Sequence, residues 1–270
     1  MGLIAAVIAT VICAVLYVRM YQREVPEPIG KRQAAIPVGL GVIAVFCTLP
    51  LYILSGFMIK TLTGGSISNV VSSLALRSLI GSFILAGFTE EFIKLLMFLI
   101  VVKVVKPKNV YEYGFLCAGV GFGFTGLEDV IYGLQNPVSS IFRVFFFGMH
   151  MMFGLIMGLQ LGFAKFSKQQ GKSGLKHTIL ALFLPVLWHT LFDASTVTNV
   201  AFNADDENVQ MIGVIVAIVM CVVSIVLQFV LLFRFKNKTA EYCAMRFDDM
   251  VSGGEAPEAE APKGRHARKE

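Results

Sequence analysis

Nine ionisable side chains interrupt long apolar stretches of this sequence, and their types are those that transfer protons or bind metal ions. They fall into four groups, each in a separate apolar stretch: Glu90, Glu91 and Lys94; Glu128 and Asp129; Arg143 and His150; His189 and Asp193. A charged side chain at the centre of a bilayer costs about 2.5–3.5 kcal/mol on insertion scales. So many of them are tolerable only if they face one another or a hydrated cavity, and we therefore expect one shared polar site.

The spacing within two of these groups predicts specific pairs. Glu90 and Lys94 are four residues apart, so on a helix they share a face. Glu91 points about 100° away, and hence the lysine cannot serve both carboxylates equally. One glutamate is expected to be held ionised while the other acts as a general base near neutral pH. His189 and Asp193 are also four residues apart, which predicts that the aspartate orients the imidazole.

Each group also has a simpler explanation when it is taken alone. A buried Glu–Lys pair is often structural, and Glu90, Lys94 and Glu128 together would also suit the proton or cation relay of a transporter or channel. A solvated position near the membrane surface would suit Glu128 and Asp129, and Arg143 could extend its guanidinium to the interface. Two glutamates, a third carboxylate and two of the chain's four histidines on separate stretches favour chemistry over these alternatives.

The elements that must position these residues are membrane-spanning helices. The chain has 270 residues, of which 56% are hydrophobic and 15% charged, too few polar residues to cover a water-soluble domain. A span needs about 20 apolar residues, and continuous apolarity selects helices because backbone amides find no water in lipid. The sequence predicts an all-α polytopic bundle of seven spans: Leu3–Val18, Ile36–Met58, Leu79–Val102, Gly114–Leu134, Ile141–Phe163, Thr178–Thr198 and Met211–Phe233.

Lysine and arginine set the expected orientation of this bundle. They cluster in the first, third and fifth connections and after the last span, whereas the sixth connection carries Asp205, Asp206 and Glu207. The positive-inside rule then places the N-terminus outside and the C-terminus in the cytoplasm. The net charge of +5 is thereby assigned to membrane topology, and no nucleic-acid partner is expected.

The predicted organisation has four parts. Residues 1–72 hold the first two helices and a basic loop, and residues 73–200 hold a four-helix core with the polar groups. Residues 201–237 form an acidic outer loop and the last helix, and residues 238–270 a disordered cytoplasmic tail. Glycines crowd the fourth and fifth spans, which predicts close packing of those helices.

The four polar groups lie in recognisable motifs. These read F-T-E-E-F-I-K (88–94), G-F-G-F-T-G-L-E-D-V-I-Y (121–132), R-V-F-F-F-G-M-H-M-M-F-G (143–154) and W-H-T-L-F-D (188–193). In this order, each on its own predicted helix, they resemble the PrsW family of intramembrane proteases, which is related to the CAAX-protease and bacteriocin-processing superfamily. One departure is Asp129, where the family pattern leads us to expect asparagine.

The resemblance implies hydrolysis of peptide bonds in membrane-anchored proteins. Single-span regulators such as anti-sigma factors are the substrate class it suggests, with signalling as the outcome. The positive-inside bias and the lack of targeting segments lead us to expect a multi-pass protein of a bacterial plasma membrane. Matched motif by motif, the working residues are Glu90, Glu91, Glu128, His150 and His189.

Two mechanisms are compatible with this resemblance, and the first uses no metal. One glutamate of the Glu90–Glu91 pair removes a proton from the water that attacks the scissile carbonyl. One of the two histidines stabilises the oxyanion and protonates the leaving amine. Lys94 holds the charge of the other glutamate, and Asp193 orients His189.

The second mechanism uses a divalent ion such as zinc. His150, His189 and Glu128 would bind the ion, which would activate the water in place of a glutamate. These three residues come from separate helices and the chain has no HExxH motif, so the sequence favours the metal-free version.

Overall fold

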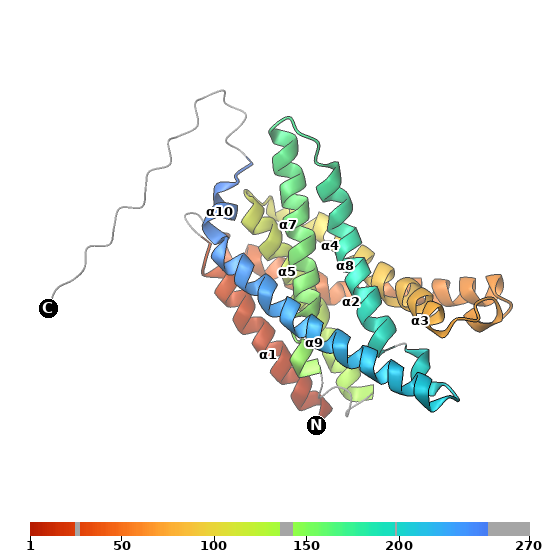
Figure 1. Cartoon of the computed structure of the whole chain (residues 1–270). Helices are drawn as coiled ribbons and strands as arrows, with labels where there is room; N and C mark the ends of the chain where they lie inside the picture. Colours follow the sequence, from red (N-terminus) through yellow and green to blue (C-terminus); the bar gives the residue numbers. More distant parts are fainter. Residues whose placement is uncertain (25–27, 136–142, 198, 248–270) are drawn as a thin grey trace.

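The chain folds into a bundle of long helices, from which α3 and the end of α2 project on one side (Figure 1). The computed structural model describes residues 1–24, 28–135, 143–197 and 199–247. Within these ranges it contains helices and no strand, apart from an isolated bridge between Asn109 and Arg246. The all-α fold predicted from the sequence is confirmed.

The described residues contain nine α-helices and four shorter helical turns. The helices are α1 (Gly2–Tyr21), α2 (Lys31–Leu62), α3 (Leu74–Ser82), α4 (Phe88–Val105), α5 (Val110–Gln135), α7 (Met149–Gln169), α8 (Leu175–Thr196), α9 (Glu207–Asn237) and α10 (Thr239–Ala244). The turns are η1 (Ile67–Asn69), the π-helical η2 (Phe83–Gly87), η3 (Val144–Phe146) and η4 (Val200–Asn203).

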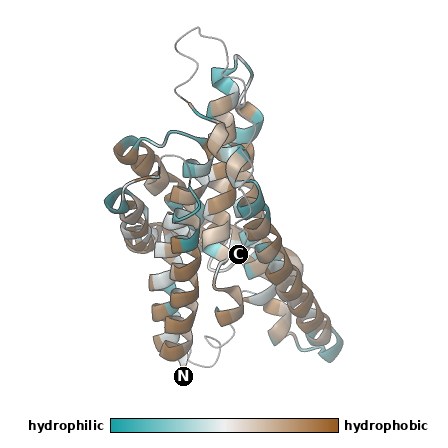
Figure 2. Cartoon of the chain, turned by 90° about the vertical axis from the view of Figure 1, so that its left-hand side faces the viewer, coloured by the Kyte–Doolittle hydropathy of each residue, from teal (hydrophilic) through white to brown (hydrophobic). Residues whose placement is uncertain are grey.

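Six of the described helices are long and apolar enough to cross a membrane, namely α1, α2, α5, α7, α8 and α9. Hydrophobic residues dominate the long helices and hydrophilic residues gather near their ends (Figure 2). The predicted third span corresponds to the consecutive α3, η2 and α4, whose apolar run is interrupted by Glu90, Glu91 and Lys94. The count of seven spans and their orientation therefore stay predictions. Ile141 and Thr198, at two predicted span ends, lie outside the described residues.

The start of the predicted tail is folded. Residues 239–244 form α10, and Phe247 beyond it is only 1% exposed. The N–H of Phe247 donates to the carbonyl of Lys108 at 2.8 Å, and the N–H of Val110 donates to the carbonyl of Met245 at 3.2 Å. These contacts order the chain up to residue 247, so the expectation of disorder from residue 238 onward is wrong for this part. Residues 248–270 lie outside the described residues.

Helix α5 is the buried centre of the bundle and packs against α1, α2 and α7. Every residue from Val110 to Gly121 is buried. The approach of α7 is so close that a Cβ on Gly121 would lie 2.0 Å from the carbonyl oxygen of His150. A Cβ on Gly154 would likewise lie 2.2 Å from the carbonyl oxygen of Cys117. Glycine at these positions lets the two backbones touch, as the glycine-rich spans predicted.

Replacing Gly121 by alanine is expected to destabilise the protein, because the new methyl group would force α5 and α7 apart. Overpacking of this kind costs about 1–3 kcal/mol. Thermal unfolding of the purified protein in detergent measures the effect. Gly126→Ala is a matched control on the same helix, because its Cβ would meet only Thr10 Cγ2 at 3.8 Å. Equal melting temperatures for the two variants would contradict the close packing.

A pair of buried acids joins the α1–α2 connection to the start of α5. Glu24 and Glu112 are both buried, and Glu24 Oε2 accepts the N–H of Ile29 at 3.1 Å. Glu112 Oε2 accepts the N–H of Lys108 at 2.7 Å. Burial, together with a hydrogen bond to Glu112, raises the pKa of Glu24 from 4.5 to about 8. Glu24 therefore keeps its proton at neutral pH.

The proton retained on Glu24 predicts that the stability of the fold falls as the pH rises. Native Glu24 holds its proton up to about pH 8, whereas the unfolded chain releases it near pH 4.5. Between these values the native state binds more protons, so the free energy of unfolding decreases with rising pH, by an amount on the order of 1–3 kcal/mol. Thermal melts from pH 5 to pH 9 should show this slope. Glu24→Gln should flatten it, whereas the exposed Glu241→Gln should leave it unchanged.

Candidate functional site

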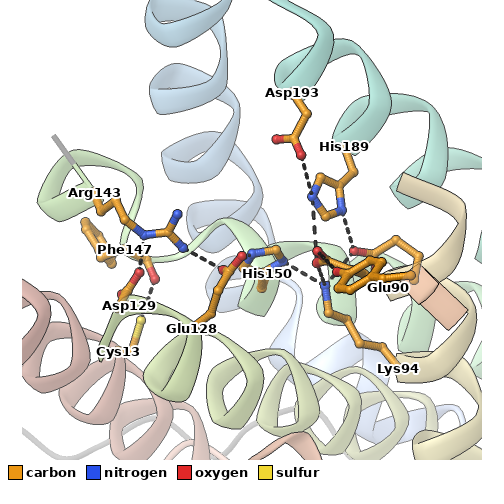
Figure 3. A network of polar contacts seen from close by, with 12 residues as sticks. Cys13, Glu90, Lys94, Glu128, Asp129, Arg143, Phe147, His150, His189 and Asp193 are labelled. Carbon is orange, nitrogen blue, oxygen red and sulfur yellow. Dashed lines mark hydrogen bonds and ion pairs between the residues drawn. The ribbon is translucent and has the colours of Figure 1, made fainter. Parts of the chain in front are cut away.

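Polar side chains from α4, α5, α7 and α8 meet inside the bundle (Figure 3). Four of them, Glu90, Glu91, His150 and His189, each offer a ligand atom, and these atoms all lie within 4.8 Å of one another. All four residues are buried. The structure thus brings together the glutamate pair and both histidines singled out in the sequence, from three different helices.

The π-helical turn η2 delivers the two glutamates to this point. Thr89 Oγ1 donates across the turn to the carbonyl of Ile84 at 2.6 Å. Gly87, the last residue of the turn, lies so close to α8 that a Cβ would be 2.2 Å from Thr190 Oγ1 and 3.1 Å from the carbonyl oxygen of Val186. This contact sets the start of α4 against the turn of α8 that carries His189. Single π-helical turns inside α-helical segments are frequent at functional sites.

Lys94 contacts both glutamates but not equally. Its Nζ lies 2.8 Å from Glu91 Oε1 and 3.3 Å from Glu90 Oε2. The closer partner is therefore the residue three positions away and not the one four away that the spacing predicted. Nζ also lies 2.8 Å from His150 Nδ1 and 3.8 Å from the centroid of the Phe124 ring. The ammonium is fully enclosed by these groups, at 1% exposure.

The two partners of His150 define its tautomer. Lys94 can only donate, so Nδ1 accepts, and Nε2 donates to Glu128 Oε2 at 2.8 Å. His150 is therefore a neutral imidazole with its proton on Nε2, held at both nitrogens. Neither nitrogen is free for a substrate in this arrangement.

His189 is held at one nitrogen and open at the other. Nδ1 lies 2.9 Å from Glu91 Oε1 and donates to it. Nε2 lies 3.9 Å from Glu90 Oε2 and 3.6 Å from Asp193 Oδ2, both beyond a good hydrogen bond. Glu91 thus makes the orienting hydrogen bond that the sequence assigned to Asp193. The Phe153 ring stacks on the imidazole with centroids 5.3 Å apart.

Arg143 lies at the other side of the site, where it pairs with two carboxylates and does not only extend to the membrane surface. Its guanidinium donates to Glu128 Oε2 and to Asp129 Oδ1, both at 2.5 Å. The same Glu128 oxygen accepts from His150, so Arg143 fixes that glutamate against the imidazole. Arg143, Glu128 and Asp193 have side chains that are 25%, 14% and 15% exposed, whereas Glu91 is fully buried. The site is therefore less enclosed around Arg143, Glu128 and Asp193 than around Glu91.

Tyr52 on α2 is a site residue that the sequence analysis did not identify. Its hydroxyl donates to Glu90 Oε1 at 2.6 Å. A signal was present, because Thr48, Tyr52 and Ser55 recur at helical spacing within an apolar run and mark one polar face.

The charges of this network do not balance by themselves. Among the described residues it contains five carboxylates, from Glu90, Glu91, Glu128, Asp129 and Asp193, and two permanent cations, from Lys94 and Arg143. In a low-dielectric interior such an excess must be offset by protons or by a bound cation. The Glu91 Oε2 atom is buried and makes no hydrogen bond within the described residues.

The donor set fits a divalent metal ion. Two carboxylates and two imidazoles are ligands that zinc and similar ions accept, and Glu91 Oε2 offers an unused buried lone pair. Glu128, which the sequence placed in the ligand set, contacts His150 but lies outside the group of four. The residues that would hold an ion are Glu90, Glu91, His150 and His189.

Comparison with known proteins gives the family. The family model described as PrsW family intramembrane metalloprotease matches residues 27–231. Proteins named Protease PrsW from Halalkalibacterium halodurans and Bacillus subtilis are 34% and 30% identical to the chain over 119 and 162 residues. These matches cover 43% and 57% of this chain and 54% and 65% of the relatives, so the chain spans only about half to two thirds of their length. No solved structure matches the chain significantly. The family match covers well over half of the sequence, and the chain therefore belongs to the PrsW family of intramembrane metalloproteases.

Proposed function

We propose that the chain hydrolyses peptide bonds of membrane-anchored proteins, with Glu90 as the general base. The observation that carries this proposal is that Glu90 and the open nitrogen of His189 face one another 3.9 Å apart in a buried group. At this separation a water molecule can accept a hydrogen bond from His189 Nε2 and donate one to Glu90 Oε2. The family match supports peptide hydrolysis as the reaction.

Glu90 suits the role of base better than Glu91. Glu91 Oε1 already accepts from both Lys94 and His189, at 2.8 and 2.9 Å, and its side chain is fully buried. Glu90 is held more loosely by Lys94, at 3.3 Å, and retains slight exposure. In this assignment Glu91 is the fixed anion that orients His189 and anchors Lys94.

The reaction requires one proton to move from water to the leaving amine. Glu90 takes a proton from the water while the water oxygen bonds to the carbonyl carbon. His189, carrying a proton on Nε2, donates a hydrogen bond to the oxyanion. The C–N bond then breaks, and the proton on Glu90 passes to the amine nitrogen. Products are a new carboxyl group, which keeps the second proton of the water, and a new amino group, and Glu90 is again ionised.

A divalent ion fits the same group, as the family description implies. Bound there, it would act as a Lewis acid on the scissile carbonyl and favour deprotonation of water. The hydrogen bonds of Tyr52 to Glu90 Oε1 and of His189 Nδ1 to Glu91 Oε1 would hold these side chains in place in either version.

Tyr52 is proposed as a positioning residue for Glu90. Its hydroxyl holds Glu90 Oε1, which leaves Oε2 directed at His189. Tyr52→Phe is expected to lower kcat about 10–100-fold with KM unchanged, because a misplaced base slows chemistry and not binding. Tyr21→Phe, whose ring packs on Phe115 near the other end of α5, is the control and should keep wild-type values. A rise in KM at constant kcat would contradict the positioning role.

The substrate proposed from the resemblance is a single-span membrane protein, of the kind that includes anti-sigma regulators, in a bacterial plasma membrane. The test uses the purified chain and a single-span reporter reconstituted together in lipid vesicles. We expect two fragments whose masses define one cut within or beside the span. Intact reporter, together with proton or cation flux that depends on the chain, would instead support a transporter.

A further inference from the structure

Lys94 occupies an unusual place for a lysine side chain. Its ammonium contacts three of the four residues that form the metal-type ligand group: Glu91 Oε1 at 2.8 Å, His150 Nδ1 at 2.8 Å and Glu90 Oε2 at 3.3 Å. The Phe124 ring holds it from another side, with the centroid 3.8 Å away. A positive charge of the protein itself therefore sits among atoms that would ligate a divalent ion.

Geometry prevents Lys94 and an ion from using these atoms together. Zinc lies about 2.0–2.2 Å from nitrogen and oxygen ligands. An ion bound through His150 in its present orientation must use Nδ1, because Nε2 is bonded to Glu128 at 2.8 Å. Nδ1 is the atom that accepts from Lys94. The ammonium would have to leave this nitrogen before the ion could bind there.

The charges of the site also set Lys94 and a divalent ion in competition. The carboxylates of Glu90 and Glu91 are the nearest anions for either cation, and both already face Lys94. A divalent ion next to the ammonium would meet its repulsion in a buried, low-dielectric site. Glu91 Oε2 is the one carboxylate oxygen of this pair that is buried without a hydrogen bond within the described residues, so it is the ready point of entry for an ion.

From these contacts we infer that Lys94 is a resident cation that competes with a divalent metal ion for the Glu90–Glu91–His150–His189 group. With the ammonium in place, its positive charge faces both glutamates without a metal. With the ammonium displaced, the same atoms form a zinc-type site. Metal affinity is then set by Lys94 as well as by the ligands. This inference concerns cation binding at the proposed catalytic site and does not require that the chain cleave peptides.

The test is a zinc-binding titration of the purified protein in detergent, against a chelator of known affinity. Lys94→Met is expected to bind one zinc ion per chain at least tenfold more tightly than wild type. Lys94→Arg, which keeps the charge, should stay within about threefold of wild type. His189→Asn added to Lys94→Met should abolish the gain, because it removes one ligand of the group.

Several results would overturn the inference. Equal zinc affinity of wild type and Lys94→Met would show that the lysine does not compete. A gain that survives His189→Asn would place the ion elsewhere, and no zinc binding by any variant would show that the group is not a metal site. If Lys94→Met does not purify as a single species, Lys94→Gln replaces it, because glutamine removes the charge and keeps a polar head. The readout is bound zinc, so failure here is distinct from a failure to cleave substrate.

Discussion

Glu90→Gln is expected to lower the rate of peptide cleavage by about 10²–10⁴-fold, the usual contribution of a general base. Glutamine keeps the shape of the side chain and can still accept from Tyr52 through its carbonyl oxygen. Lys94 keeps Glu91 as its closer partner, so the fold should survive. Single-turnover cleavage of the reporter in vesicles gives the rate without interference from product release.

The matched control for this change is Glu112→Gln. Glu112 is also a buried glutamate, but it lies in the first turn of α5 and accepts the N–H of Lys108. The carbonyl oxygen of glutamine can replace that acceptor, and cleavage should continue at the wild-type rate. A folded Glu90→Gln protein that cleaves as fast as wild type would remove Glu90 from the role of base.

His189→Asn is expected to lower kcat/KM by about 10²–10³-fold, a loss typical of removing one oxyanion donor. In the wild type, Nδ1 of the imidazole faces Glu91 and Nε2 faces Glu90. The shorter asparagine side chain cannot reach Glu91 and also present a donor beside Glu90. The measurement is the substrate dependence of reporter cleavage for the purified variant.

His177→Asn provides the comparison within the same helix. His177 lies near the start of α8, where Nδ1 contacts Gln160 Oε1 at 2.7 Å, and it has no contact with the site residues among the described part of the chain. Its replacement should leave kcat/KM unchanged. Similar losses for both histidine variants would indicate damage to α8 and not loss of a catalytic group.

Much of the fold could be predicted because each helix is specified by the residues of its own segment. Continuous apolar runs specify helices in lipid, and the apolar lengths identified the helices that the structure contains. The third predicted span was the hardest to identify as a membrane span, because the candidate catalytic residues also interrupt its apolar run. The π-helical turn ahead of Glu90 left no sequence signal, since it depends on how closely Gly87 packs against α8.

The gathering of polar groups could be foreseen from the cost of burying charge, but their pairing could not. Spacing along one helix pointed Lys94 at Glu90 and Asp193 at His189. In the structure Glu91 is the closest carboxylate to both Lys94 and His189. The contact with His189 depends on how α8 packs against α4, which the sequence of one helix cannot reveal. Tyr52 escaped notice for the same reason, since its partner lies 38 residues away on another helix.

Isotope labelling tests the central claim most directly. The wild-type chain and the reporter are incubated in vesicles prepared in H₂¹⁸O, and the two fragments are analysed by mass spectrometry. Hydrolysis by a water activated at Glu90 predicts one ¹⁸O atom in the new carboxyl terminus, with fragments from Glu90→Gln forming about 10²–10⁴-fold more slowly under the same conditions. An intact reporter with the folded wild-type chain, or equal labelled cleavage by the Glu90→Gln protein, would contradict the account.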